Sequence, residues 1–346
     1  MKGRIVLLDE SNGRHAAALM VNGQLEDFLV DPPDGRPGPG AIFRAVVDRQ
    51  MKGQGGVFVK LPRGRAFLRQ AKGLKPGQSL LVQVTGYAEP GKASPVTPKL
   101  LFKSRYAIVT PDAPGLNLSR TIRDDQERDR LLEVAHDAMQ GATDGIGLIL
   151  RSACAGVEGT VIAEDIAAVR GLAERVLKDS SGAPELLLDA PDAHLQAWRD
   201  WAQPEPDQVI RVQGAFAEHG VDEAIEALSG PALLPGGGAL WIEPTRALVA
   251  VDVNTGPDSS PAAGLKANIA AARDLPRQLR LRGLGGQVVV DFAPMPAKDR
   301  GQLEQVLRAA FRADAVDTNL VGWTTMGNYE LQRKRERLPL SEGLAS

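Results

Sequence analysis

Residues 247–256, ALVAVDVNTG, constrain the fold most, because they place an acid and an amide in an otherwise apolar strand pattern. Residues two apart in a strand share a face, so Asp252 and Asn254 are expected on one face and the valines on the other. A carboxylate that leaves water costs several kcal/mol unless it is paired or bound to a cation. The pattern therefore predicts a functional site at the end of this strand.

A second short apolar run ends in the same way. Residues 285–292 read GGQVVVDF, so Asp291 follows three valines. Two strands that each deliver an oxygen ligand to one sheet edge are a usual way to hold a hard divalent cation. The pair Asp252 and Asp291 therefore predicts a metal site.

The composition excludes several other classes of protein. The 346 residues are 43% hydrophobic and 24% charged, which is enough for a sizeable core and predicts two or more domains. A net charge of -2 argues against a protein that binds polyanions over its whole surface, but permits local basic patches. The single cysteine, Cys154, excludes an intramolecular disulfide and a cysteine-rich zinc module. No signal segment opens the chain and no apolar run approaches the about 18 residues of a membrane helix, so we expect a cytoplasmic protein with no membrane partner.

The first hundred or so residues read as short strands separated by turns. Within residues 1–34, Asn22-Gly23 lies between two apolar runs, which is typical of a β-hairpin. The Pro- and Gly-rich residues 32–40 indicate a linker. Five short apolar runs between residues 41 and 103 then predict a small barrel of the OB type.

The predicted barrel carries aromatic residues among basic ones. Phe58 and Phe67 suit single-stranded nucleic acid, because bases stack on rings while cations meet phosphates. The alternative is that both rings belong to the core and the basic side chains only solubilise the surface. The basic residues in this stretch are Arg44, Arg49, Lys52, Lys60, Arg63, Arg65, Arg69, Lys72 and Lys75.

Strand and helix signals alternate between residues 105 and 183. A predicted strand at residues 145–150 runs directly into Arg151 and Ser152. An arginine and a hydroxyl at the mouth of a strand are natural anion ligands. On spacing alone, a structural salt bridge or a cap is the stronger alternative.

Two further strands are predicted after this region. Residues 185–189 and 209–212 read as strands around a helix at residues 191–201. Such a unit packs readily onto an existing sheet. We therefore expect it to complete the sheet begun by residues 1–34.

A basic helix is predicted between the two acid-bearing strands, over residues 261–282. This stretch contains no glutamate, and its basic residues are Lys266, Arg273, Arg277, Arg280 and Arg282. Pro276 is expected to kink or divide the helix. Cations beside a two-acid metal site suit a phosphodiester substrate, whereas the alternative is a solvated face. Residues 326–337 form another basic run, a pattern usually found on an exposed helix surface.

Several of these segments together resemble a known family. Five segments resemble, in order and spacing, the signature blocks of the bacterial ribonuclease E/G family. They are residues 246–256, Asn268, residues 277–286, residues 290–292 and residues 327–335. Residues 145–156 resemble the sensor that this family uses for an RNA 5′ end.

The resemblance implies a multidomain α/β fold. The implied parts are an RNase H-like core with an inserted OB-fold barrel and 5′-sensor domain, followed by a DNase I-like catalytic subdomain. The corresponding boundaries are residues 1–34 with 184–235 for the core, 35–104 for the barrel, 105–183 for the sensor, and 236–346 for the catalytic subdomain.

The resemblance also implies an activity and roles for residues. The activity is a magnesium-dependent endoribonuclease, with Mn²⁺ able to substitute, that cuts single-stranded RNA to 5′-phosphate and 3′-hydroxyl ends in rRNA processing and mRNA decay. Asp252 and Asp291 would hold the metal, and Asn254 would orient the acids or the scissile phosphate. The other implied contacts are Arg151 and Ser152 to the 5′-monophosphate, and Phe58, Phe67, Lys92, Lys266, Asn268, Arg277, Arg280, Arg333 and Arg335 to RNA.

The chain departs from the family pattern in two places. Larger members continue into a Cys-x-x-Cys zinc link, whereas this chain stops at Ser346 with one cysteine, so we expect no zinc. We therefore also expect no zinc-linked dimer, which leaves a monomer or a different homo-oligomer. Thr325 stands where the family tends to have an arginine. These departures keep open the alternative of an RNA-binding or regulatory protein of the same fold with little or no cleavage.

Overall fold

The computed structural model describes residues 3–33, 36–50, 55–69, 73–89, 91–258 and 260–344, without the side chains of residues 49, 50 and 261. The chain divides into two compact units. Unit 1 comprises Met1–Pro33 and Asp207–Ser346, and unit 2 comprises Asp34–Pro206. No helix in the described ranges is long and apolar enough to cross a membrane.

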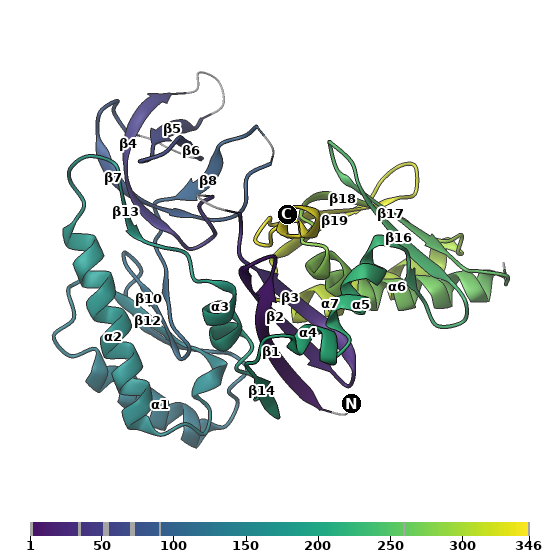
Figure 1. Ribbon diagram of the computed structural model, residues 1–346, viewed down its shortest axis with the longest axis horizontal. Coiled ribbons are helices and arrows are strands. Elements are labelled where there is room, and N and C mark those ends of the chain that lie inside the picture. Colours follow the sequence, from purple (N-terminus) through teal and green to yellow (C-terminus); the bar gives the residue numbers. More distant parts are fainter. Residues whose placement is uncertain are drawn as a thin grey trace. The chain divides into compact units, whose positions relative to one another are not determined.

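Unit 1 begins with a twisted sheet in the order β14-β1-β2-β3 (Figure 1). Its strands are β1 (Arg4–Ser11), β2 (Arg14–Val21), β3 (Gln24–Val30) and β14 (Gln208–Ile210). Asn22 and Gly23 both have positive φ, of 52° and 82°, between paired Val21 and Gln24, so the predicted hairpin is confirmed. The short helices beside this sheet are α4 (Ala215–Glu218), α5 (Val221–Glu226), η2 (Ala227–Ser229) and α8 (Leu340–Gly343).

A second sheet of unit 1 has the order β15-β16-β17-β18-β20-β19. Two helices run along this sheet (Figure 1). Valines on alternate positions of the central strands pack in one core cluster with apolar residues of these helices. The strands are β15 (Ala232–Leu233), β16 (Ala239–Pro244), β17 (Val249–Asn254), β18 (Gly286–Asp291), β19 (Thr318–Trp323) and β20 (Tyr329–Arg333). The helices are α6 (Pro261–Leu281), η3 (Ala297–Asp299) and α7 (Arg300–Ala313).

Helix α6 connects the parallel strands β17 and β18 and passes through Pro276 without interruption. The prediction that this proline divides the helix is therefore wrong. A proline inside a helix costs about 3 kcal/mol. Ala272, Leu275 and Leu279 are all buried in the same core, before and after the proline, and their burial offsets that cost.

Unit 2 contains a small closed barrel in its described part. The strands pair in the order β4-β5-β6-β8-β7, and β7 returns to β4, so five strands close the barrel, as expected for an OB fold. They are β4 (Ile42–Gln50), β5 (Val57–Lys60), β6 (Arg65–Leu68), β7 (Ser79–Val84) and β8 (Ser94–Thr97).

Strand β13 (Glu185–Leu188) does not join the N-terminal sheet but pairs with β4. Only the second predicted strand, now β14, pairs with β1 as expected. The difference has a physical cause in the buried Arg44 of β4. Its guanidinium donates to the Ala183 carbonyl over 2.7 Å and pairs with Asp179 and Glu185, which holds the segment before β13 against the barrel.

The rest of unit 2 is a sheet in the order β11-β12-β10-β9 with two helices packed on it. This layer buries the single cysteine, Cys154. Burial raises the pKa of its thiol to about 12, so the thiol is a core group. The elements are β9 (Phe102–Lys103), β10 (Ala107–Thr110), β11 (Leu116–Leu118), α1 (Asp125–Ala138), β12 (Gly147–Leu150), η1 (Ser152–Cys154), α2 (Gly159–Lys178) and α3 (Ala193–Asp200).

Candidate active site and RNA-contact residues

The structure brings Asp252 and Asp291 side by side. Asp252 of β17 is the direct register partner of Asp291 of β18 in a parallel pair. Adjacent strands lie about 4.8 Å apart, so both carboxylates leave neighbouring positions on one face of the sheet. Val251 and Val290 beside them are buried against the helices, whereas both acids are exposed on the opposite face. The strand alternation thus places one carboxylate pair in water on a rigid support.

Asn254 belongs to the same face and contacts Asp252 directly. Its Nδ2 donates to Oδ2 of Asp252 over 2.7 Å. This bond restrains the Asp252 carboxylate and orients the amide with its donor toward the acid. Asn254 is therefore positioned to hold Asp252 in one orientation.

The donor set of this face fits a hard divalent cation. Two carboxylates and an amide offer oxygen ligands, which Mg²⁺ prefers, and Mg²⁺ usually keeps several waters. In the ranges that the structure describes, no group of three or more His, Cys, Asp or Glu side chains is arranged to hold a metal. The protein would thus contribute a partial shell, as in sites where substrate phosphate completes the coordination.

Asn268, expected to contact RNA, lies fully inside unit 1. Its Oδ1 accepts from the Ala293 amide over 2.9 Å, and its Nδ2 donates to the Ala293 carbonyl over 2.8 Å. Ala293 follows Asp291 by two residues, so Asn268 anchors the chain just beyond the acid. Contact with RNA would require this buried side chain to leave both bonds, which is costly. Asn268 therefore has a structural role here.

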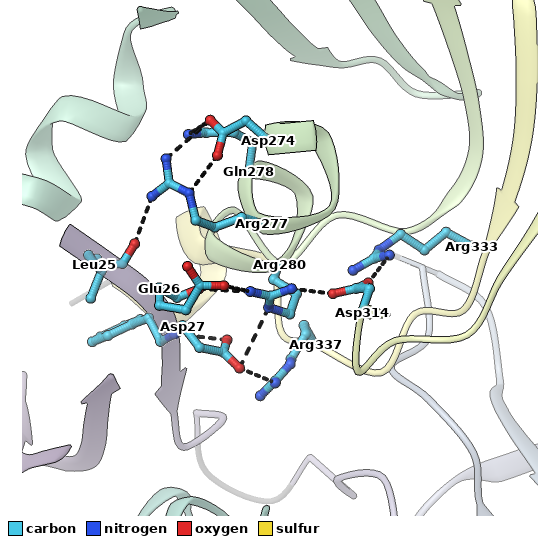
Figure 2. Close-up of polar contacts among 11 residues, drawn as sticks. Leu25, Glu26, Asp27, Asp274, Arg277, Gln278, Arg280, Asp314, Arg333 and Arg337 are labelled. Carbon is cyan, nitrogen blue, oxygen red and sulfur yellow. Dashed lines mark hydrogen bonds and ion pairs between the residues drawn. The ribbon is translucent and has the colours of Figure 1, made fainter. Parts of the chain in front are cut away.

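Arg280 and Arg333 are also buried, in an ion-pair network that Figure 2 shows. Arg280 pairs with Glu26, Asp27 and Asp314, and Arg333 pairs with Asp314 over 2.6 Å. Burial lowers the pKa of Arg333, whereas the nearby acids raise the pKa of Arg280 despite its burial. Neither side chain is presented to RNA, because each neutralises buried carboxylates.

Arg277 contacts the N-terminal sheet in a similar way. It pairs with Asp274 over 2.6 Å and donates to the Leu25 carbonyl over 2.7 Å (Figure 2). Sequence spacing cannot distinguish an arginine that is paired inside the protein, such as Arg277, from one that faces solvent, since arginines and lysines of both kinds lie on α6. The basic helix is thus largely a joint between two sheets of unit 1.

The remaining cations expected to contact RNA lie nearer the surface. Lys266 of α6 is exposed, and Lys92 is exposed and paired with Glu89 over 2.6 Å. Arg335 is half-buried, and its guanidinium lies so close to Gly286 that any side chain at that position would collide with it. These three residues keep surface that a phosphate could reach.

Phe58 and Phe67 face each other across β5 and β6 on the outside of the barrel. They are direct register partners, with ring centroids 5.4 Å apart and ring planes at 58°. Val57 and Leu68, next to them, point inward and are buried in the barrel core. Both rings are partly exposed, and neither belongs to the core cluster of the barrel. Among the nearby basic residues, Lys52, Lys72 and the Arg49 side chain lie outside the described residues.

Arg151 is engaged in a salt bridge. Its Nη1 donates to the Ser104 carbonyl over 2.7 Å, and its Nη2 donates to Asp200 over 2.8 Å, while Ser152 opens the short helix η1. Burial alone would raise the pKa of Asp200, but hydrogen bonds and charge from Arg199 and Arg151 outweigh it and lower the pKa to about 2. The Asp200 carboxylate is thus ion-paired with the Arg151 guanidinium, which was expected to bind a phosphate.

Asp200 is a residue that sequence reasoning missed. It lies 49 residues from Arg151 in the chain, and no local motif links the two. Only the folded chain brings the end of α3 to the residue that follows β12 and so reveals the pair.

These features define an α/β protein with a small closed barrel in one unit and, in the other, two adjacent carboxylates on the exposed face of a sheet. A family model described as "Ribonuclease E/G family" matches residues 102–213 and 211–336, and the chain belongs to this family.

Curated relatives named ribonuclease E or ribonuclease G match most of the chain in sequence. Ribonuclease E of Nostoc sp. is 29% identical over 92% of this chain and 54% of its own length. Ribonuclease E of Synechocystis sp. is 28% identical over 99% of this chain and 58% of its own length. Ribonuclease G of Escherichia coli (strain K12) is 26% identical over 96% of this chain and 80% of its own length. The chain thus spans a little more than half the length of the two ribonuclease E relatives.

Proposed function

We propose that the protein is an endoribonuclease whose active site is built on Asp252 and Asp291. The observation that carries the proposal is the direct register of these two exposed acids on β17 and β18, in a chain of the ribonuclease E/G family. The proposal includes single-stranded RNA as substrate, a cytoplasmic role in RNA processing, and the RNase H-like and DNase I-like character of the two sheets of unit 1.

The proposed roles follow from the chemistry of the face. When bound by the two carboxylates, Mg²⁺, or Mn²⁺ in its place, would lower the pKa of a water and neutralise charge on the scissile phosphate. Asp252 and Asp291 would hold the cation, and Asn254 keeps the Asp252 carboxylate oriented through its 2.7 Å bond. Water adds to phosphorus and gives up a proton, while the bond between phosphorus and the 3′ oxygen breaks and that oxygen takes up a proton, which yields 5′-phosphate and 3′-hydroxyl ends.

The proposed RNA contacts are those with accessible surface. Phe58 and Phe67 offer half-exposed rings to unpaired bases, and stacking of this kind contributes about 1–3 kcal/mol per base. The cations proposed to contact phosphates are Lys266, Lys92 and Arg335. Salt should weaken each of these contacts.

The direct test is cleavage of a single-stranded RNA that carries a 5′-monophosphate. We expect magnesium-dependent cutting that EDTA abolishes, with new 5′ ends that accept ligation without prior phosphorylation. RNA binding without any magnesium-dependent cutting would overturn the enzyme and support the RNA-binding alternative. Ends that ligate only after kinase treatment would overturn the proposed products.

A separate prediction concerns the proposed 5′ sensor around Arg151. Arg151→Ala should narrow the rate ratio between 5′-monophosphate and 5′-hydroxyl substrates by about tenfold, because one charge-assisted bond contributes about 1.5–3 kcal/mol. Asp200→Asn should widen that ratio, because it frees the guanidinium from its carboxylate partner. The measurement is cleavage of both substrates by each variant, with the exposed Asp144→Asn as the matched control. Equal ratios in all variants would contradict a sensor at Arg151.

A further inference from the structure

An exposed tryptophan stands next to the two acids. Trp241 of β16 is the direct register partner of Asp252, and Asp252 is the direct partner of Asp291. The three residues therefore form one row across three neighbouring strands, on the face that the helices leave open. Trp241 is 44% exposed, whereas its neighbour Leu240 is buried in the core. The backbone of this large aromatic residue thus lies one strand spacing, about 5 Å, from that of Asp252 and two spacings from that of Asp291.

The surroundings of Trp241 differ from those of other tryptophans in the chain. The ring of Trp198, which is 50% exposed, has the guanidinium of Arg105 at 4.9 Å, and that of Trp323 has Arg300 at 4.5 Å. Within the described ranges, no guanidinium and no aromatic ring is placed against Trp241. Its π-face therefore remains available to a ligand.

The charge of this face explains why an aromatic contact would be useful there. Glu243 is the register partner of Ala250, and Glu330 is the partner of Val289, so two more acids share the face with Asp252 and Asp291. Such a surface repels the phosphates of RNA wherever no cation intervenes. A stacked base adds binding free energy that does not depend on the sign of the charge.

We propose that Trp241 is the stacking platform for the base of a nucleotide beside the scissile phosphate. The inference rests on the proposed function, since it takes the phosphate to lie at Asp252 and Asp291. A base can stack on the indole only when it has left any duplex, so Trp241 would select RNA that is unpaired at the cleavage site. Trp241 is then a positioning and specificity residue, and the proton and phosphorus chemistry stays with the acids.

The test combines substitutions with substrates that lack one base. Trp241→Ala should raise KM for single-stranded RNA by about tenfold, whereas Trp241→Phe, which keeps a ring, should stay within about threefold. For the wild type, an abasic nucleotide next to the cleaved bond should raise KM by the same factor as the Trp241→Ala substitution does. In Trp241→Ala itself, the abasic nucleotide should cause no further rise in KM. Trp198→Ala, which removes an equally exposed ring in unit 2, is the matched control and should retain the full abasic effect. An abasic penalty of equal size in wild type and Trp241→Ala at every scanned position would overturn the inference.

A second measurement separates this inference from the proposed activity. Tryptophan fluorescence should fall when single-stranded RNA binds, and the fall should be smaller in Trp241→Phe, whether or not the RNA is cut. A fluorescence difference without cleavage would overturn the endoribonuclease alone. Cleavage with equal quenching in both proteins would overturn the stacking platform alone.

Discussion

Asp252→Asn and Asp291→Asn are each expected to lower the cleavage rate of single-stranded RNA at least about a thousandfold, equivalent to about 4 kcal/mol of barrier. Each substitution removes one of the two neighbouring carboxylates of β17 and β18 that are proposed to bind the cation. The asparagine keeps the size of the side chain, so the sheet and its helices should stay intact. Single-turnover cleavage with saturating Mg²⁺ measures the effect directly.

The matched control for this result is Glu243→Gln, which removes an exposed acid from the same face. Glu243 lies across from Ala250 rather than from an acid, so its loss should change the rate by less than about threefold. RNA binding, measured by fluorescence anisotropy, should stay within about threefold for all three variants, because phosphate and base contacts elsewhere remain. Undiminished cleavage by both aspartate variants would show that the reaction takes place elsewhere.

Asp314→Asn is expected to destabilise unit 1 by about 3–5 kcal/mol. The Asp314 side chain is fully buried and is shared by the guanidiniums of Arg280 and Arg333, which are also buried (Figure 2). Removing its charge leaves Arg333 with only neutral groups such as the Thr318 hydroxyl, at 2.8 Å, among the partners seen in the described residues. An uncompensated buried charge costs far more than an exposed one.

The measurement is urea unfolding followed by tryptophan fluorescence, with each transition fitted separately because the chain has two units. Asp317→Asn provides a control with the same charge change nearby. Asp317 is 71% exposed and pairs with Lys334 over 3.1 Å, so its loss should cost less than about 1 kcal/mol. Equal shifts for the two variants would mean that the buried network contributes no more than a surface pair.

Local patterns predicted the elements and the faces of several side chains. The alternation around Asp252 and Asn254 placed both on one face of β17, since a strand has a period of two whatever surrounds it. The structure shows that this face is exposed, so the expectation that the carboxylate leaves water is wrong. The Asn22-Gly23 turn was predictable for the same reason, because its positive φ angles depend on the residues themselves. The short runs between residues 41 and 103 likewise indicated a barrel before any pairing was known.

Long-range partners were beyond the reach of these patterns. Arg280 binds Glu26, 254 residues away, and Arg151 binds Asp200, 49 residues away. An arginine in a helix reads the same in sequence whether it faces water, RNA or a buried acid. Its partner depends on which elements pack together, and that is why Asn268, Arg280 and Arg333 were assigned to RNA but lie in the interior.

Asp252 and Asp291 illustrate which features the sequence determines and which only the tertiary structure decides. The sequence by itself determined that Asp252 lies on the opposite face of its strand from Val249, Val251 and Val253, and that Asp291 ends an apolar run, because backbone geometry sets side-chain direction locally. Tertiary structure alone decided that β17 and β18 are parallel neighbours in a register that joins the two acids, with Trp241 completing the row from β16. Register depends on how α6 and the core pack against the sheet, and this packing sums many distant contacts that no single stretch of sequence contains.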